Sequence, residues 1–167
     1  QDIGRAAYIA REAAKKGLKS KVPLMVTPGS EVTRATIERD GYLKDLESIG
    51  ATVLANACGP CIGQWKRDDI GEGEVNSIVS SYNRNFPARN DGNKETLSFI
   101  GSPESVIGLA LGGSLDFDFL NDSLINDSGE EVKLTPPIAE ELPLEGFANT
   151  LDGFIQPTPG DDVEVVI

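Results

Sequence analysis

The two cysteines of the sequence, Cys58 and Cys61, enclose a Gly-Pro dipeptide and are the only thiols in 167 residues. Thiolates are nucleophiles and soft metal ligands. Two of them on one glycine-proline turn can share a metal, cycle between dithiol and disulfide, or bridge each other. The spacing leaves these chemistries open, together with a buried structural pair, since cysteine also packs as a small hydrophobe.

A metal site at these cysteines requires ligands from elsewhere. Structural zinc takes four nitrogen or sulfur ligands, and the sequence has no histidine and no second cysteine pair, which argues against zinc. An iron–sulfur cluster remains open, with two thiolates from Cys58 and Cys61 and at least one from another segment.

A second candidate site lies in the polar loop 83–93, where Arg84 and Arg89 flank Phe86-Pro87. A guanidinium is a rigid fork that can bind a carboxylate through two parallel hydrogen bonds. Exposed arginines in turns commonly contribute little, so the composition of this loop does not decide its role. Next to a cluster-binding loop, however, the two arginines indicate a site for a polycarboxylate.

Short apolar runs alternate with amphipathic segments and predict the elements that position these residues. Apolar residues recur at the helical period from Ile3 to Ala14, and Gly17 is placed to end that helix. The pattern further predicts strands at 22–27, 51–55, 77–81 and 97–100, and helices at 31–40, 43–49 and 103–111.

This alternation predicts an α/β fold, a three-layer α/β/α sandwich with a mainly parallel sheet. Because sites in such folds form beyond the carboxyl ends of strands, Cys58, Cys61, Arg84 and Arg89 are expected to share one rim. Residues 1–115 are expected to form the core with both loops, and residues 116–167 an acidic edge extension and the start of an interdomain linker.

Composition limits the partners and the compartment. Residues 1–100 carry 14 Lys and Arg against 13 Asp and Glu, whereas residues 101–167 carry 1 against 14. No basic face for nucleic acid is present, and no apolar run of about 18 residues could span a membrane. The cysteine content fits a reducing compartment, the cytoplasm or the mitochondrial matrix. The opening Gln1-Asp2 suggests a piece of a longer protein.

Several motifs in order resemble the aconitase family, specifically its third α/β/α domain. The resemblance covers nearly the whole chain and is densest from Lys21 to Leu111. The motifs that carry it are 27–30 (TPGS), 34–41 (RATIERDG), 55–65 (ANACGPCIGQW), 81–86 (SYNRNF) and 89–93 (RNDGN).

The resemblance implies a 4Fe-4S cluster held by three cysteines, with one iron left open for the hydroxyl and carboxylate of citrate or isocitrate. Cys58 and Cys61 match two cluster ligands, and the third is expected upstream of Gln1. Asn83 matches a residue beside the cluster, and Arg84 and Arg89 match the arginines that bind substrate carboxylates. The family interconverts citrate and isocitrate through cis-aconitate, with acid–base residues from its other domains. This chain alone is therefore expected to be inactive.

Three alternatives are kept beside this reading. Homoaconitases and isopropylmalate dehydratases are similar hydro-lyases that depart from the Gly-Gln-Trp continuation after Cys61. The Cys-Gly-Pro-Cys tetrapeptide also resembles the redox loop of thioredoxins, but there a tryptophan directly precedes the first cysteine, where this sequence has Ala57. Some aconitase relatives bind RNA, which the acidic tail disfavours for this segment.

Overall fold

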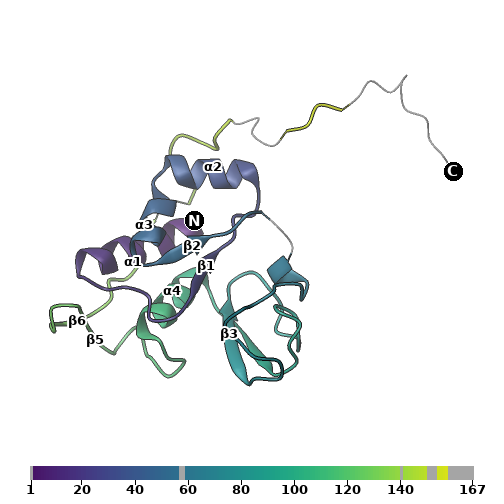
Figure 1. Cartoon of the computed structure of the whole chain (residues 1–167). Coiled ribbons are helices and arrows are strands. Elements are labelled where there is room, and N and C mark those ends of the chain that lie inside the picture. The colour runs from purple at the N-terminus through teal and green to yellow at the C-terminus, as the bar shows by residue number, and fades with distance from the viewer. Residues whose placement is uncertain (1, 57–58, 140, 150–153, 158–167) are drawn as a thin grey trace.

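The structure is a computed structural model that describes residues 2–56, 59–139, 141–149 and 154–157. The helices and strands follow one another in the order anticipated from the sequence pattern (Figure 1). They are α1 Asp2–Lys15, β1 Leu24–Val26, α2 Glu31–Arg39, α3 Tyr42–Ser48, β2 Ala51–Val53, the 3₁₀ turn η1 Gly59–Cys61, β3 Asn76–Ser80, β4 Thr96–Ile100, α4 Pro103–Gly112, β5 Leu124–Ile125 and β6 Glu131–Val132.

Local signals fix the ends of the helices. The hydroxyl of Ser30 accepts a hydrogen bond of 3.1 Å from the Thr33 amide at the start of α2. Ser102 caps α4 in the same way through the amide of Ser105, at 3.3 Å, and Pro103 follows it in the first turn. These caps satisfy amides that the first turn of a helix leaves without a partner.

Strands β1 to β4 form parallel pairs, as expected for an α/β fold, whereas β5 and β6 form an antiparallel hairpin. Strand β1 pairs with β2 in the register Leu24 to Ala51, and β3 pairs with β4 in the register Asn76 to Thr96. Among the described residues these two pairs remain separate two-stranded sheets. The structure thus supports the α/β class, in a coarser form than a single sheet between two helical layers.

The hydrophobic core lies on one side of the molecule. It is built from the small face of α1, the buried sides of α3 and α4, and strands β1 and β2. Leu124 of β5 also belongs to it, and Phe117 and Leu134 pack against it. The division of the chain at residue 115 stays a prediction.

Residues 59–100, called the site lobe below, lie beside this core and carry η1, β3 and β4 (Figure 1). In the described part of the lobe no hydrophobic side chain is fully buried. The buried residues there are instead polar, namely Ser80, Asn83, Asn90 and Thr96. Polar contacts must therefore hold this lobe together, because buried polar groups are costly unless they are hydrogen-bonded.

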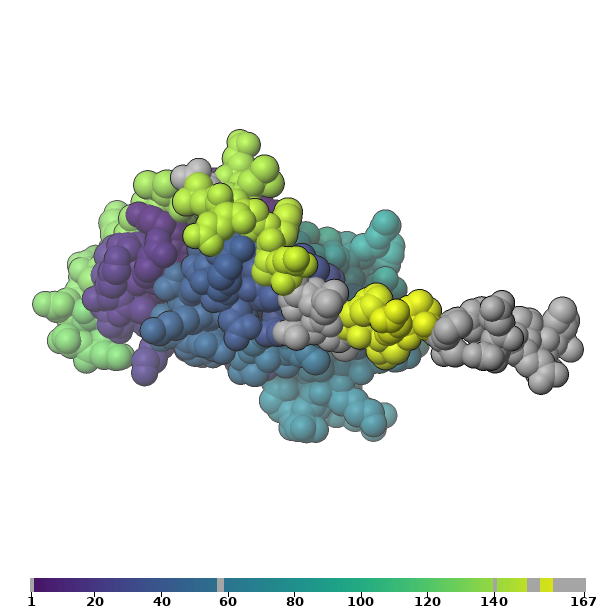
Figure 2. Space-filling view, turned by 90° about the horizontal axis from the view of Figure 1, so that it is seen from above, coloured from purple at the N-terminus to yellow at the C-terminus, as the bar shows by residue number. Residues whose placement is uncertain are grey.

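The segment after the β5–β6 hairpin returns over α2. The amide of Ala148 donates to the hydroxyl of Thr36 at 2.8 Å, and the Arg39 guanidinium donates to the Gly146 carbonyl at 2.8 Å. Figure 2 shows this yellow-green segment lying across the blue helices. None of the helices in the described ranges is long and apolar enough to cross a membrane.

Candidate functional site

The turn that carries Cys61 follows β2. Cys61 ends η1 and is half-buried. The carbonyl of Gly59 accepts hydrogen bonds from the amides of Ile62 at 3.3 Å and Gln64 at 3.0 Å, which closes the turn. Cys58 lies outside the described residues, so the predicted pairing of its sulfur with that of Cys61 stays a prediction.

The arginine loop, residues 81–95, connects β3 to β4. The amide of Arg89 donates to the Phe86 carbonyl at 3.1 Å, and the amide of Gly92 donates to the Ala88 carbonyl at 3.2 Å. Ala88 has a φ of 61°, the only non-glycine residue among those described with a left-handed backbone. Such a conformation is uncommon for alanine, and persists where surrounding contacts fix it.

The buried side chain of Asn83 joins the two loops. Its amide nitrogen donates to the Pro60 carbonyl at 3.0 Å and to Oδ1 of Asn90 at 2.7 Å. Its Oδ1 accepts from the backbone amide of Arg84 at 2.8 Å and from Nε of Arg89 at 3.3 Å. One amide therefore ties the residue preceding Cys61 to both arginines, and the expectation that these loops meet is met for Cys61, Arg84 and Arg89.

The backbones of the two loops also approach each other closely. Gly63 has a φ of +78°, and a Cβ placed on it would lie 2.6 Å from the Ala88 carbonyl oxygen. The amide of Trp65 donates to the Asn90 carbonyl at 3.3 Å. A side chain at position 63 would collide with the backbone, so this contact requires glycine.

The sequence interpretation missed a buried polar network that extends this contact. Arg67 contacts Asn76 at 2.7 Å and Asp91 at 3.4 Å through Nη1. The carboxylate of Asp91 also accepts from the hydroxyl of Thr96 at 2.8 Å. Asn76 and Thr96 open β3 and β4 and face each other in the register. Asn76 and Thr96 directly precede the strands predicted at 77–81 and 97–100, and polar residues at the matching ends of two strands were the available signal.

The guanidiniums of Arg84 and Arg89 differ from those of the other arginines. Within the described part of the chain neither forms an ion pair, and the hydrogen bond of Arg89 is to the neutral Asn83. Each of the other arginines has a carboxylate partner, namely Arg5, Arg11, Arg34, Arg39 and Arg67. The two arginines predicted to bind a polycarboxylate thus retain positive charge that no carboxylate in the described ranges pairs with.

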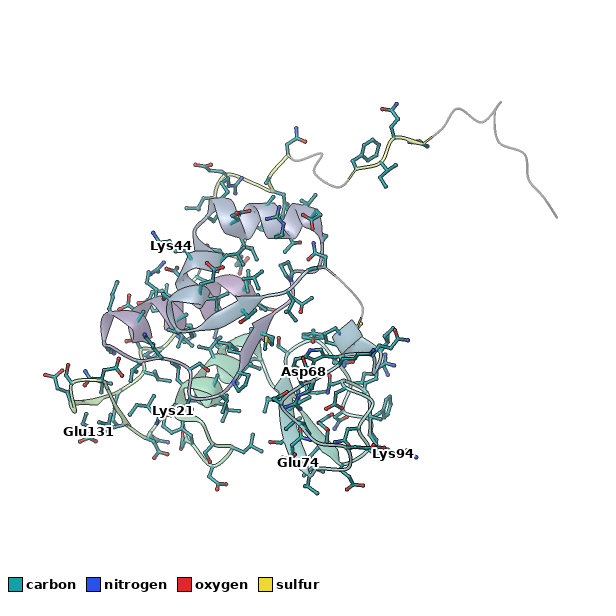
Figure 3. All side chains as sticks on the ribbon, in the orientation of Figure 1. Lys21, Lys44, Asp68, Glu74, Lys94 and Glu131 are labelled. Carbon is teal, nitrogen blue, oxygen red and sulfur yellow. The ribbon has the colours of Figure 1, made fainter. Side chains whose placement is uncertain are left out.

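Charge and burial also affect the groups around the turn. Desolvation by neighbouring protein atoms, and then the Cys61 sulfur, raises the pKa of Tyr82 above its ordinary value, although Tyr82 remains 56 % exposed. The labelled Asp68, Glu74 and Lys94 of the site lobe are exposed in Figure 3 and contribute no charge to its buried contacts.

The donor set fits an iron–sulfur cluster in part. Cys61 offers a soft sulfur ligand on a half-buried turn, which is the ligand type such clusters use. The described residues contain no group of three His, Cys, Asp or Glu side chains placed to hold a metal ion. Cys61 is thus the one cysteine sulfur available in the described ranges, and any complete set of cluster ligands needs further residues.

Comparison with known proteins places the chain in a class of enzymes. The family model described as the aconitase family (aconitate hydratase) matches residues 1–113. The chain therefore belongs to the aconitase family.

Individual relatives cover the whole chain. It is 49 % identical over 168 residues to a probable mitochondrial aconitate hydratase of Dictyostelium discoideum, and 50 % identical over 167 residues to a mitochondrial aconitate hydratase of Arthroderma benhamiae. It is 46 % identical over 172 residues to the mitochondrial homocitrate dehydratase of Saccharomyces cerevisiae. In each case 100 % of this chain is covered, and the chain spans 21–22 % of the relative's length.

Proposed function

We propose that this chain provides one domain of an aconitate hydratase, which interconverts citrate and isocitrate through cis-aconitate. The observation that carries the proposal is the pair Arg84 and Arg89, which have no carboxylate partner among the residues that the structure describes and which Asn83 links to the turn of Cys61. Family membership and the names of the relatives support the reaction. Since the relatives are named mitochondrial, the mitochondrial matrix is the proposed location.

Arg84 and Arg89 bind two carboxylates of the substrate in this proposal. A charge-assisted hydrogen bond between guanidinium and carboxylate is stronger than a neutral one, and the fork fixes the orientation of the bound group. Asn83 binds Nε of Arg89 and the backbone amide of Arg84, so it orients the Arg89 guanidinium and fixes the backbone from which the Arg84 side chain extends. The chain thereby binds and orients the tricarboxylate relative to the cysteine turn.

Cys58 and Cys61 are proposed as two thiolate ligands of a 4Fe-4S cluster, with a third from outside this two-cysteine sequence. When bound, the cluster supplies a Lewis-acidic iron that polarises the substrate hydroxyl. Asn83 lies between the cysteine turn and the arginines and is proposed to orient groups beside the cluster. Proton transfer needs an acid and a base, which are proposed to come from other domains of the parent enzyme.

The finer architecture is part of the same proposal. In the complete enzyme we expect the parallel pairs β1–β2 and β3–β4 to belong to one mainly parallel sheet of a three-layer sandwich. Residues 116–167 would then lead toward the next domain. The partners of this chain are therefore the remaining domains of the parent and the tricarboxylate substrate.

A second candidate is a homoaconitase, because the chain is 46 % identical to a homocitrate dehydratase. Homocitrate differs from citrate by a methylene, and a methylene is worth only about 1–3 kcal/mol of discrimination in a pocket. The residues at hand bind carboxylates in either substrate. Comparing kcat/KM for citrate and homocitrate with the complete enzyme decides between the two.

Replacing each arginine by lysine in the complete enzyme tests the proposal. Arg84→Lys and Arg89→Lys keep the charge and lose the fork. Each should lower kcat/KM by roughly 10- to 150-fold, which corresponds to a charged hydrogen bond of about 1.5–3 kcal/mol. Arg11→Lys, at the Asp45 ion pair of α1 and α3, is the control and should leave kcat/KM within about twofold. Unchanged kinetics in both loop variants would overturn the proposed roles.

The cluster is tested separately by anaerobic reconstitution of the complete enzyme. The wild type should show broad visible absorbance, and Cys58→Ser and Cys61→Ser should each abolish or strongly weaken it. Retention of full absorbance in both variants would show that these sulfurs are not cluster ligands.

A further inference from the structure

We propose that Arg67 is a positioning residue that fixes the arginine loop against the cysteine turn through Asp91. The inference rests on the proposed function, because it concerns how Arg89 is presented to a tricarboxylate.

The pair Arg67 and Asp91 is largely shielded from solvent. Their side chains are 12 % and 3 % exposed, and Nη1 of Arg67 lies 3.4 Å from Oδ2 of Asp91. Breaking a buried pair by removing one partner is costly, because it leaves a charge in a poorly solvated site. The carboxylate of Asp91 would then have to move toward water, and the backbone that carries it would follow.

The pair extends a series of contacts between the cysteine segment, residues 59–67, and the arginine loop. Along both segments the partners advance together, because Pro60 meets Asn83, Gly63 meets Ala88, Trp65 meets Asn90 and Arg67 meets Asp91. Asp91 lies two residues after Arg89 and Arg67 six residues after Cys61. The ion pair is thus the last contact of a series that begins next to Cys61 and Arg84. Arg89 lies within this series.

The shape of the guanidinium explains why arginine suits this position. Nη1 contacts both Asn76 and Asp91, while Nη2 binds Asp69 at 2.8 Å and Nε binds the same carboxylate at 3.2 Å. The guanidinium also lies over the ring of Trp65, 5.5 Å from its centroid. A lysine ammonium is a single point charge and could not maintain these contacts at once.

Arg11 provides a matched control on the other side of the molecule. It forms an ion pair with Asp45 at 3.2 Å and lies 5.3 Å from the ring centroid of Tyr8. It therefore has the same kinds of partner as Arg67, but it joins α1 to α3 and touches neither loop.

The experiment compares Arg67→Gln, Arg67→Lys, Asp91→Asn and Arg11→Gln in the complete, cluster-loaded enzyme. The probe is propane-1,2,3-tricarboxylate, which has carboxylates but no hydroxyl to eliminate. Arg67→Gln should weaken its binding about tenfold or more, since misplacement of a group by about 1 Å can cost up to about 100-fold. Arg11→Gln should change it less than twofold. KM for the substrate should rise with the same pattern while the visible absorbance of the cluster persists.

Hydrogen exchange of the loop provides a readout that needs no ligand. Amides of residues 83–92 should exchange faster in Arg67→Gln than in the wild type and in Arg11→Gln. The double variant Arg67→Gln/Asp91→Asn should recover part of the lost protection, because it removes the buried charge that Arg67→Gln leaves unpaired. If Arg67→Gln does not fold, Arg67→Lys and Asp91→Asn decide by the same criteria.

The outcomes separate the inference from the proposed function. Unchanged probe affinity and unchanged loop exchange in folded Arg67 and Asp91 variants would overturn the positioning role. The proposed function would be refuted if the wild-type enzyme neither binds the tricarboxylate nor converts citrate. If the loop nevertheless exchanges faster in Arg67→Gln than in that wild type, the link between Arg67 and the loop still holds.

Discussion

Gly63→Ala tests the close contact between the two loops most directly. Alanine at a φ of +78° costs about 1–2 kcal/mol for the left-handed backbone. Its Cβ would also stand 2.6 Å from the Ala88 carbonyl oxygen, a distance that real Cβ atoms do not adopt. Because the obstacle is backbone, relief requires a shift of the arginine loop, and such overpacking typically adds about 1–3 kcal/mol. The expected loss of stability is therefore about 2–5 kcal/mol.

Gly129→Ala separates the two contributions. Gly129 has a φ of +82° in the turn of the β5–β6 hairpin, and nothing lies within 4 Å of its hypothetical Cβ. This variant should lose only the backbone contribution of about 1–2 kcal/mol. Urea unfolding can be followed by far-ultraviolet circular dichroism, which reports on the helices of the core and the strands of the site lobe together. Equal losses in the two variants would refute the close approach of the loops.

Three further changes have defined outcomes. Asn83→Ala leaves the Pro60 carbonyl and Asn90 without the donor that they share, so the free energy of unfolding measured in urea should fall by about 1–3 kcal/mol. An unchanged free energy of unfolding would mean that water replaces the amide. For Glu104, burial opposes ionisation, but hydrogen bonds from its own backbone amide and from Arg5 outweigh it and lower its pKa. The Glu104 carboxylate therefore stabilises the fold above its unfolded pKa of about 4.3, and this contribution is lost as the pH falls through the lowered native pKa. Glu104→Gln should flatten the pH dependence of the melting temperature in that range. Parallel curves for the variant and the wild type would contradict the assignment. Gly112→Ala places a Cβ 2.4 Å from the ring of Phe117. Although alanine has the better helix propensity, this clash should lower the melting temperature. A higher melting temperature would show that the Phe117 ring moves aside freely.

Much of the fold followed from local signals. The helical period ending at Gly17 and the hydroxyl caps at Ser30 and Ser102 are short-range features, and the structure confirms the elements they predict. The parallel pairing of β1 with β2 was predictable because helices α2 and α3 lie between them, whereas only a loop connects the parallel strands β3 and β4. Which strands pair into one sheet depends on long-range contacts, and the described residues form separate pairs.

The sequence led us to expect Cys61, Arg84 and Arg89 at the common edge of one sheet, whereas the structure brings their loops together through Asn83 from two separate strand pairs. Asn83 acts through four partners whose distances depend on how the two loops are juxtaposed. The pairing of Arg67 with Asp91 joins residues 24 positions apart, and no local pattern in the sequence distinguishes it from an exposed charge pair. The geometry of these groups emerges only once the loops are packed together.

The polar interior of the site lobe has a consequence for how the molecule opens. Unfolding that exposes little apolar surface has a small heat-capacity change and a weak response to denaturant. The lobe, whose buried residues are Ser80, Asn83, Asn90 and Thr96, should therefore fluctuate open as a subglobal unit while the aliphatic core stays closed. The predicted substrate arginines would then lie in the less stable part of the molecule, where the free energy of binding a tricarboxylate can be coupled to the ordering of the site lobe.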